Sequence, residues 1–450
     1  MYQLLLQQFL RTKTCQLGLA LVLILGILSI ITGKQFLLDQ EKIASQVAAK
    51  QGEHIERNLE LHGDDLPLLL YYLKFSLVSQ PYPLAGLSIG QKDVNPSVQR
   101  VTILTLEGQK YDADLVNPTK LLYGNLDLSF IIVYLFPLLI IAFTYNLFSE
   151  EAESGTWKMV NTMAKSTIQF LLAKLIVRFL LLASVLLLLL VAGVLIMGIS
   201  INGIFLLFTI SSILYLIFWF VLCFWIVCLR RNSNFNALTL LSFWLILVIL
   251  LPAFINNYLT NAYPIPEALS TMIKQRDGYH KKWDSEKRAT MVKFYEDYPQ
   301  LKHHGFPPEE GFDWPWYYAM QHLGDLESRE ESNAMQEKIR LREEMSRLCA
   351  RFIPSLHIQL AHNDMAGTGL LQHMNFLALT TDFHKKTRLY FYPKIFGNES
   401  PESVNWQDFQ PNQIQLRGEI SWFTVLMPLL LSILLFSGLS AMQIRKDLRA

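Results

Sequence analysis

Residues 128–160 read LSFIIVYLFPLLIIAFTYNLFSEEAESGTWKMV, an uncharged apolar run that ends abruptly in a cluster of glutamates. The run 128–148 has about the 20 residues that a helix needs to cross the hydrocarbon core of a bilayer. Glu150, Glu151 and Glu153 follow it directly. Because a charged side chain costs roughly 2.5–3.5 kcal/mol at the centre of a membrane helix, these glutamates mark the end of a span. The stretch therefore predicts a membrane protein.

The composition of the whole chain points the same way. Of the 450 residues, 52% are hydrophobic and only 17% are charged, which is unusual for a soluble domain. The formal net charge is +1, so we expect no nucleic-acid partner. The four cysteines include no C-x-x-C pair, which argues against a disulfide framework and against a zinc knuckle.

The first apolar run, from about Leu17 to Ile31, follows Arg11 and Lys13 and has two interpretations. A secretory signal peptide would need a small-residue cleavage site after its apolar core. Here Lys34 comes soon after the run and no such site follows it. We therefore favour an uncleaved anchor helix, which its flanking residues extend to spanning length.

Five further runs are long enough to span a bilayer, and they are longer than the apolar stretches of ordinary buried helices. They lie at 128–148, 170–199, 204–228, 235–256 and 420–441. Basic clusters flank the runs, and all fall on the cytoplasmic side if the chain crosses six times with both termini inside. These clusters are Arg11 and Lys13, Lys158 and Lys165, Lys174 and Arg178, Arg230 and Arg231, and Arg445, Lys446 and Arg449.

Two long segments, 37–127 and 257–419, then lie outside the cytoplasm. The first opens with a polar helical pattern and later contains VQRVTILTL (98–106), whose alternation and β-branched residues predict a strand. The second holds two charged helix-forming stretches, 266–299 and 327–352, separated by HHGFPPEEGFDWPWYY. The predicted fold is a mainly α membrane protein of six transmembrane helices. Its large extracytoplasmic domain, α-rich with some β structure, is built from the two insertions.

Motifs for enzyme chemistry are nearly absent. The sequence has neither the P-loop pattern G-x-x-x-x-G-K-[ST] nor the metalloprotease pattern H-E-x-x-H. GLSIG matches the nucleophile elbow G-x-S-x-G, but the prolines around it favour a loop, so we do not expect Ser88 to be a nucleophile. His357 and His362 are five residues apart and His303 and His304 are adjacent, so neither pair has the i, i+4 spacing of a zinc site on a helix. We expect this chain to bind no metal or cofactor and to have no enzyme activity of its own.

The residues after the span predict a short second helix at the cytoplasmic surface. Ser149 can cap it, and carboxylates in a first turn favour the positive end of the helix dipole by about 0.3–1 kcal/mol each. Apolar residues after the Gly155-Thr156 pair are spaced for one face of that helix: Trp157, Val160, Met163 and Ala164. Lys158 and Lys165 would then point toward lipid headgroups or a partner. A simple connector on the membrane surface is the alternative interpretation.

The run from 128 to 175 resembles the second span and coupling region of ABC-2-type permeases. In that family a span ends in E-x-E-x-G-T, followed by a short helix and a lysine before the next span. The matching residues here are Glu151, Glu153, Gly155, Thr156 and Lys174. The resemblance extends to NPTKLLYGNLDLSF, RRNSNFNALTLLSFWLILVILLPAFINN, HIQLAHNDMAGTGLLQHMNFL and YFYPKIF, and it covers most of the chain from about residue 80. Together these stretches look like the ABC-2 permeases that carry a large extracytoplasmic domain of unknown function.

This resemblance implies a permease subunit of an ABC transporter, generally an exporter, in the inner (cytoplasmic) membrane. A separate ABC ATPase, which binds ATP and Mg²⁺, would dock on the cytoplasmic side, and a second permease chain, identical or similar, would complete the pair. The other expected partners are membrane lipid and extracytoplasmic proteins. The ATPase-coupling residues that it implies are Glu150, Glu151, Glu153, Gly155, Thr156, Trp157 and Lys158. Glu151 and Glu153 would contact the ATPase, and Gly155 would allow close approach of the backbone.

The apolar runs and the predicted topology divide the chain. The expected units are an N-terminal segment with the first span (1–36), a first insertion (37–127), the second span (128–148), a coupling helix (149–169), spans three to five (170–256), a second insertion (257–419), and the sixth span with a cytoplasmic tail (420–450). Three positions depart from the family pattern. Ala152 replaces a basic residue, Ala164 a proline and Ala173 a glycine.

A membrane scaffold and an intramembrane enzyme are the alternatives to transport. A membrane scaffold that passes force or a signal to its outer domain, without moving a substrate, fits the same features. An intramembrane enzyme would need polar catalytic groups inside the spans, which are nearly absent. Arg178 is the one charge placed well inside a span, and we favour snorkelling of its side chain to the inner boundary over a functional role.

Overall fold

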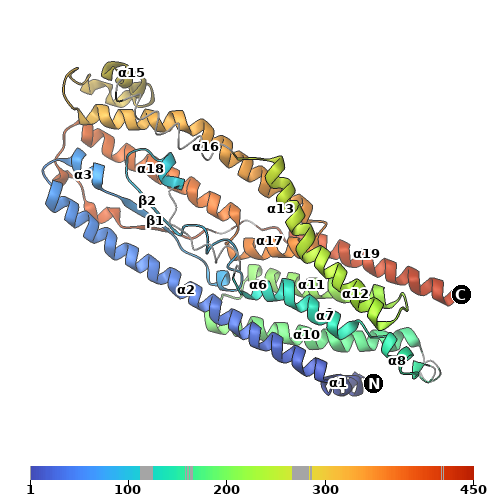
Figure 1. Ribbon diagram of the computed structural model, residues 1–450. Coiled ribbons are helices and arrows are strands. Elements are labelled where there is room, and N and C mark those ends of the chain that lie inside the picture. The colour runs from blue at the N-terminus through green and yellow to red at the C-terminus, as the bar shows by residue number, and fades with distance from the viewer. Residues whose placement is uncertain are drawn as a thin grey trace.

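The computed structural model describes residues 2–111, 125–157, 159, 162, 166–265, 283, 286–416, 418 and 420–449. Helices account for most of these residues. The molecule is elongated, with a helical bundle at one end and a second domain at the other (Figure 1). Both termini lie at the free end of the bundle, away from the second domain (Figure 1).

In the described part of the chain, six helical segments are long and apolar enough to cross a membrane, which confirms the predicted number of spans. Four are single helices: α2 (Lys13–His62), α10 (Thr167–Met197), α11 (Gly203–Val227) and α19 (Trp422–Arg449). The second span joins α6 (Leu128–Phe130), η2 (Ile131–Leu135) and α7 (Phe136–Thr144). The fifth joins α12 (Ser233–Trp244), η3 (Leu245–Leu250) and α13 (Leu251–Ala262).

The second and fifth spans share an interruption of their helical hydrogen bonding. In each, a π-helical stretch directly precedes a proline near the start of the next helix: Pro137 after η2 and Pro252 after η3. Proline has no N–H to donate, so a carbonyl one turn earlier needs another donor. In the second span, the Tyr215 hydroxyl of α11 donates to the Val133 carbonyl at 3.0 Å. Such donors from neighbouring helices are needed because the bilayer core offers no water.

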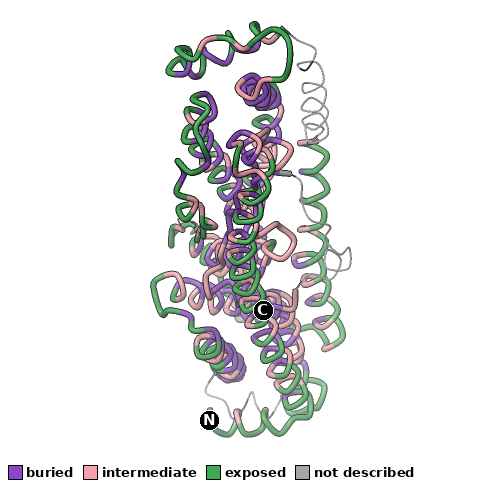
Figure 2. Tube along the Cα trace, turned by 90° about the vertical axis from the view of Figure 1, so that its left-hand side faces the viewer, coloured by how far each residue is buried: buried purple, intermediate pink, exposed green. Residues whose placement is uncertain are grey.

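The spans differ in how much of their surface the bundle covers. The most apolar window of the second span is 67% buried, whereas the fifth is 11% and the sixth 17% buried. Figure 2 shows this as a buried centre flanked by helices with exposed outer sides. The Trp244 indole in the fifth span donates to the Tyr134 carbonyl at 3.2 Å, which joins the two interrupted spans. The fifth and sixth spans therefore present apolar surface outward, as shown by Leu238, Phe254 and Leu434.

The second domain is continuous with the bundle through α2. This helix runs unbroken from Lys13 to His62, across the boundary expected at residues 36–37. The other helices of the domain are α3 (Leu66–Tyr72), α4 (Glu107–Tyr111), α15 (Lys287–Asp297), α16 (Trp314–Ala350) and α18 (Leu370–Phe396). The long helices α2, α16 and α18 extend along the length of the domain (Figure 1).

A three-stranded sheet lies within this domain in the order β2-β1-β3. β1 (Phe75–Ser79) pairs antiparallel with β2 (Val98–Val101) and parallel with β3 (Asn412–Ile414), so both insertions contribute strands. The strand predicted over 98–106 is correct only in its first half, because the chain turns and α4 begins at Glu107. The strands β1 and β3 were not predicted.

The helix predictions for the second insertion are partly correct. Residues 266–282 lie outside the described residues, and α15 covers most of the remainder of the stretch predicted over 266–299. α16 begins at Trp314, well before the predicted start at residue 327. Pro315 does not break this helix because it occupies the first turn, where its missing N–H would have no helical partner.

A short helix, α17 (Pro354–Ala366), crosses the end of the bundle that faces the second domain. Its His357 pairs through Nε2 with the Val425 carbonyl of the sixth span at 2.8 Å. Its buried His362 contacts Ser129 Oγ of the second span at 2.8 Å and Ser212 Oγ of the fourth at 3.2 Å. These histidines thus join helices of the bundle. Ser88 lies in a loop, as predicted from GLSIG, and its hydroxyl donates to Asn363 Oδ1 at 2.8 Å.

Candidate functional site

The glutamate-rich segment forms a short helix, α8 (Ser149–Glu153), directly after the second span. Ser149 was expected to cap this helix, and that prediction is wrong. Phe148 occupies the capping position without a side-chain hydrogen bond. The Ser149 hydroxyl is buried and pairs instead with the Ser233 hydroxyl at 2.7 Å, so it contacts the start of the fifth span.

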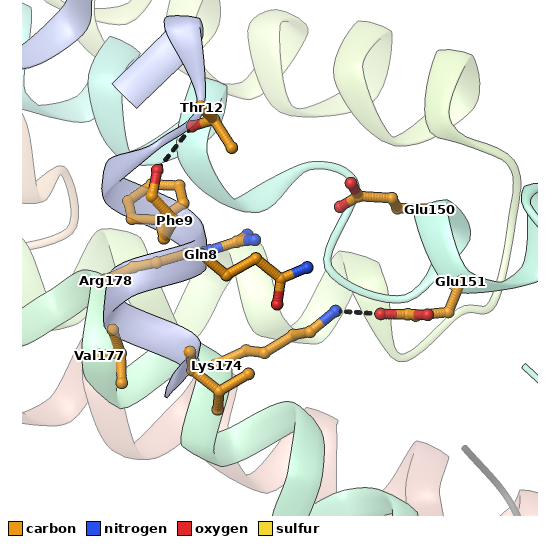
Figure 3. A pocket seen from close by; sticks show the side chains of 9 residues that line it. Gln8, Phe9, Thr12, Glu150, Glu151, Lys174, Val177 and Arg178 are labelled. Atoms are coloured by element: carbon orange, nitrogen blue, oxygen red, sulfur yellow. Dashed lines mark hydrogen bonds and ion pairs between the residues drawn. The ribbon is translucent and has the colours of Figure 1, made fainter. Parts of the chain in front are cut away.

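The carboxylate of Glu151 links α8 to the third span. Its Oε1 lies 2.6 Å from Nζ of Lys174 on α10 (Figure 3). The side chains are only 18% and 9% exposed, respectively, so water screens this pair less than it screens a surface pair. The Thr156 hydroxyl donates to the other carboxylate oxygen, which holds the turn after α8 against the same pair.

The carboxylate of Glu153 links α8 to the fifth span. It accepts hydrogen bonds from the backbone N–H of Ser233 at 2.8 Å and from the Ser233 hydroxyl at 2.9 Å. Ser233 is the first residue of α12, so the negative charge lies at the positive end of that helix dipole. Asn236 of α12 also donates its side-chain amide to the Tyr145 carbonyl at 3.0 Å. The start of the fifth span is therefore bound to the end of the second by several polar contacts.

Glu150 differs from Glu151 and Glu153 in its hydrogen-bond partner, which belongs to the same segment. Like Glu153 it is exposed, and its carboxylate accepts a hydrogen bond from the amide of Asn146 at 3.2 Å. Ala152 and Gly155 are exposed as well. Gly155 has a φ of +76°, in the left-handed region that glycine adopts without strain. An added Cβ would meet nothing within 4 Å in the described structure, so the requirement for glycine within the chain is conformational.

A small cavity of about 60 Å³ lies beside the Glu151–Lys174 pair (Figure 3). Its walls come from α1 (Tyr2–Leu10), α8, α10 and the α1–α2 connection. The lining residues are Leu5, Gln8, Phe9, Thr12, Glu150, Glu151, Lys174, Val177 and Arg178. The role of α1 as a wall of this site was not predicted from the sequence, although its YQLLLQQFL pattern mixes apolar residues with glutamines as a surface helix does.

Arg178 lines the same cavity. Its guanidinium donates to the Phe143 carbonyl of the second span and lies 4.8 Å from the centre of the Phe9 ring. The side chain thus reaches the cavity at the α8 end, yet it stays buried, at 7% exposure. The prediction of snorkelling is therefore correct for the direction of the side chain, but the charge is not exposed at the boundary. The residue joins α1, the second span and the third span.

A family model for ABC-2 family transporter proteins matches residues 6–296, more than half of the chain. The chain belongs to the ABC-2 transporter family. A second model, for a domain of unknown function (DUF3526), matches residues 269–414. No curated protein and no solved structure matches the chain. The resemblance to ABC-2 permeases with an additional domain is therefore confirmed.

The structure brings together the charged residues that the ABC-2 pattern spaces far apart in sequence. Glu151 and Lys174 meet as an ion pair, and Thr156 joins them. Trp157 is half-buried, with its ring 4.4 Å from that of Phe148. Lys158, Val160, Met163, Ala164 and Lys165 lie outside the described residues, so the amphipathic helix predicted after the turn stays a prediction.

The departures from the ABC-2 pattern occupy different environments. Ala152 is exposed on α8, between the two glutamates that bind other helices. Ala173 is buried, at 1% exposure, next to Lys174 on α10. A basic residue at position 152 would add a positive charge to the exposed side of α8, so its replacement by alanine leaves the surface near Glu150 more acidic.

Proposed function

We propose that this ABC-2 family member is the permease subunit of an exporter in the cytoplasmic membrane. A separate ATPase, which binds ATP and Mg²⁺, docks on α8 and the turn that follows it. The observation that carries this proposal is the pair of glutamate links. Glu151 binds the third span at Lys174, and Glu153 binds the fifth span at Ser233. Any displacement of α8 by a partner is therefore passed to two spans besides the second.

The links give the three glutamates separate roles. The hypothesis based on sequence assigned ATPase contacts to Glu151 and Glu153, but both carboxylates bind groups of their own chain. We assign the docking contact to the exposed side of α8, with Glu150 as its charged group and Gly155 at the turn. Glu151 and Glu153 transmit the movement. Since Glu150 lies beside the cavity of α1, a docked ATPase would also touch the N-terminal helix.

Orientation in the membrane is part of the proposal. Lys174 pairs with Glu151 of α8, Arg230 lies 5.8 Å from the centre of the Phe148 ring just before α8, and Arg11 lies in the α1–α2 connection. Both termini lie at this end of the bundle (Figure 1). By the positive-inside rule this end faces the cytoplasm. The second domain, at the opposite end, then lies outside. The exposed apolar surfaces of the fifth and sixth spans are available to a second permease chain.

The interrupted spans provide the flexibility that transport needs. π-Helical stretches and prolines are common sites of helix bending. The second and fifth spans carry both, and they are the spans that α8 joins through Ser149 and Glu153. Closure of the ATPase dimer would push α8, and the two spans would bend at η2 and η3 to open a path toward the second domain.

Co-purification tests this function. The tagged full chain should capture an ABC ATPase, and that enzyme's rate of ATP hydrolysis should change when the permease is present. E151Q/E153Q should still capture the ATPase but lose this effect, because the links to the spans are gone. E150K should weaken capture. E296Q/E330Q, which changes two exposed glutamates of the second domain, should do neither. Unchanged regulation of the ATPase by E151Q/E153Q would refute the transmission roles.

A second candidate function also has structural support. α2 continues from the first span into the second domain without a break, and Arg342 of α16 caps the end of the fifth span. Its Nε donates to the Tyr263 carbonyl at 2.7 Å and its Nη2 to the Thr260 carbonyl at 3.2 Å. Movement of these spans would therefore reach the domain directly, as a force-transmitting scaffold requires. If ATP changed the protection of the second domain from an added protease, while no substrate moved into vesicles, the scaffold would be favoured over the exporter.

A further inference from the structure

A second and larger cavity opens in the domain at the other end of the molecule. It has a volume of about 190 Å³ and lies between α2 and the sheet. Residues of α2, of β1 and its preceding residue, and of β2 form its walls: Val47, Lys50, Gln51, His54, Lys74, Ser76 and Arg100. None of these residues belongs to the site around α8.

The cavity exists because apolar packing between α2 and the sheet stops partway along the strands. Ala44 and Val47 of α2 pack against Val78 and Val98, which face each other across β1 and β2. Side chains alternate along a strand, so the next residue of β1 on this face is Ser76, which is too small to fill the space.

Polar groups form the floor of the cavity. The buried Gln51 accepts a hydrogen bond from the Ser76 hydroxyl at 2.8 Å and donates to the Lys74 carbonyl at 2.9 Å. His54, one turn further along α2, accepts from the backbone N–H of Lys74 at 3.1 Å. These contacts fix the distance between the helix and the first strand, so the space between them is built into the fold.

Three cations surround this space. Arg100 is paired in register with Ser76, Lys74 precedes β1, and Lys50 lies on the flank of α2 beside Gln51. Among the described residues, none of these three side chains forms an ion pair with a carboxylate or a hydrogen bond through its charged group. A cleft lined by one sign of charge concentrates counter-ions and is a favourable place for an anion.

Nearby carboxylates do not neutralise the cluster. The glutamates of this part of α2 are Glu53, Glu56 and Glu60, and all three are exposed. At 100° per residue, they project from the side of the helix opposite Gln51, whereas Lys50 lies on the flank shared with His54. Glu53 is only about 60° from Lys50 around the helix, but none of these glutamates lines the cavity, and among the described residues none forms an ion pair with Lys50, Lys74 or Arg100.

We propose that this pocket binds a small soluble anion bearing phosphate or carboxylate groups. Lysine and arginine make their strongest hydrogen bonds to such groups. A cavity of about 190 Å³ has room for a phosphate or a small phosphate ester. The inference does not rest on the proposed export function.

Distance from the membrane separates a soluble anion from a lipid headgroup. Along α2, Lys50 lies about 24 Å beyond Lys34, which ends the first apolar run, at about 1.5 Å per residue. The headgroup layer of one leaflet is only roughly 5–8 Å thick. Lipids of the surrounding bilayer therefore do not reach the pocket, although they carry the same phosphate chemistry.

Calorimetric titration of the purified full chain in neutral phosphatidylcholine nanodiscs tests the site, with pyrophosphate and citrate as probes. At least one probe should bind at millimolar concentration or below. K50Q/K74Q should weaken that binding by about tenfold or more, since two charge-assisted contacts are lost. K293Q/K385Q removes the same charge from exposed lysines elsewhere in the domain and should have no such effect. Absence of binding by both probes, or equal weakening by the two double variants, would overturn the proposal.

Two further measurements control for misfolding of the variants and for binding of a lipid headgroup. R100K keeps the charge and should bind within about threefold of the unmodified chain, whereas R100Q should not. Thermal unfolding without anion should be equal in R100K and R100Q. Replacing part of the phosphatidylcholine by phosphatidylglycerol should leave probe binding unchanged, and competition by that lipid would show that the pocket takes a lipid headgroup instead.

Discussion

The ion pair between Glu151 and Lys174 gives the most quantitative prediction. At 2.6 Å and an effective dielectric constant near 20, the direct attraction is about 6 kcal/mol. Desolvation offsets much of this, because both side chains lie largely out of water. Removing one charge leaves the other uncompensated, so E151Q and K174Q should each lower the free energy of unfolding by about 2 kcal/mol. E151Q/K174Q should cost little more than either change alone.

A double-mutant cycle on unfolding of the detergent-solubilised chain measures this coupling directly. We expect a coupling energy near 2 kcal/mol. The exposed pair of Glu337 and Arg340, 2.8 Å apart with side chains 51% and 53% exposed, supplies the matched control. Water and salt screen that pair, so its cycle should give a much smaller coupling energy. If the two cycles gave the same small value, Glu151 would not be a mechanical link between α8 and the third span.

Three other predictions concern separate parts of the molecule. At Gly155, with φ +76°, G155N should preserve regulation of the ATPase better than G155A, since asparagine tolerates the left-handed region; equal loss would instead indicate close approach by the partner. Y215F should lower the free energy of unfolding by about 1 kcal/mol by removing the donor to Val133, whereas Y258F, at an exposed ring, should not; equal effects would refute that role. Burial, followed by the positive charge of Arg388, lowers the pKa of His322 to about 4. The folded-state pKa lies below the unfolded value of 6.5, so protonation of His322 favours the unfolded chain. The contribution of neutral His322 to the free energy of unfolding is therefore fully present above pH 6.5 and is lost as the pH falls through 4, a loss of roughly 3 kcal/mol. The free energy of unfolding in urea, measured from pH 7 to pH 4, should fall less steeply for H322N than for the unmodified chain. An unchanged dependence on pH would contradict the lowered pKa of His322.

The bundle could be predicted from sequence because each span is a long, nearly continuous run of apolar residues. Apolar length alone gives the six segments, and the E-x-E-x-G-T pattern locates the end of the second. The contacts of that pattern could not be read in the same way. Lys174 and Ser233 are far from α8 in sequence, and only packing of the third and fifth spans beside the second brings them to Glu151 and Glu153.

The second domain was less predictable because its strands are short and pair with residues far away in the sequence. β1 pairs with β3 across more than 330 residues of chain, and neither strand has an alternating pattern long enough to stand out. The early start of α16 was missed because Pro315 was interpreted as a helix breaker, although proline is well tolerated in a first turn. The basic cavity depends on register between Ser76 and Arg100, which no local pattern reveals.

Site-specific photo-cross-linking from position 150 tests the central claim most directly. A photoreactive residue replaces Glu150 on the exposed side of α8, and a second variant carries it at the exposed Glu296 of the second domain as a control. We expect a cross-link from position 150 to the ATPase that co-purifies with the chain, and none from position 296. A cross-link to the ATPase from position 296, or its absence from position 150 while the ATPase remains bound, would contradict docking on α8.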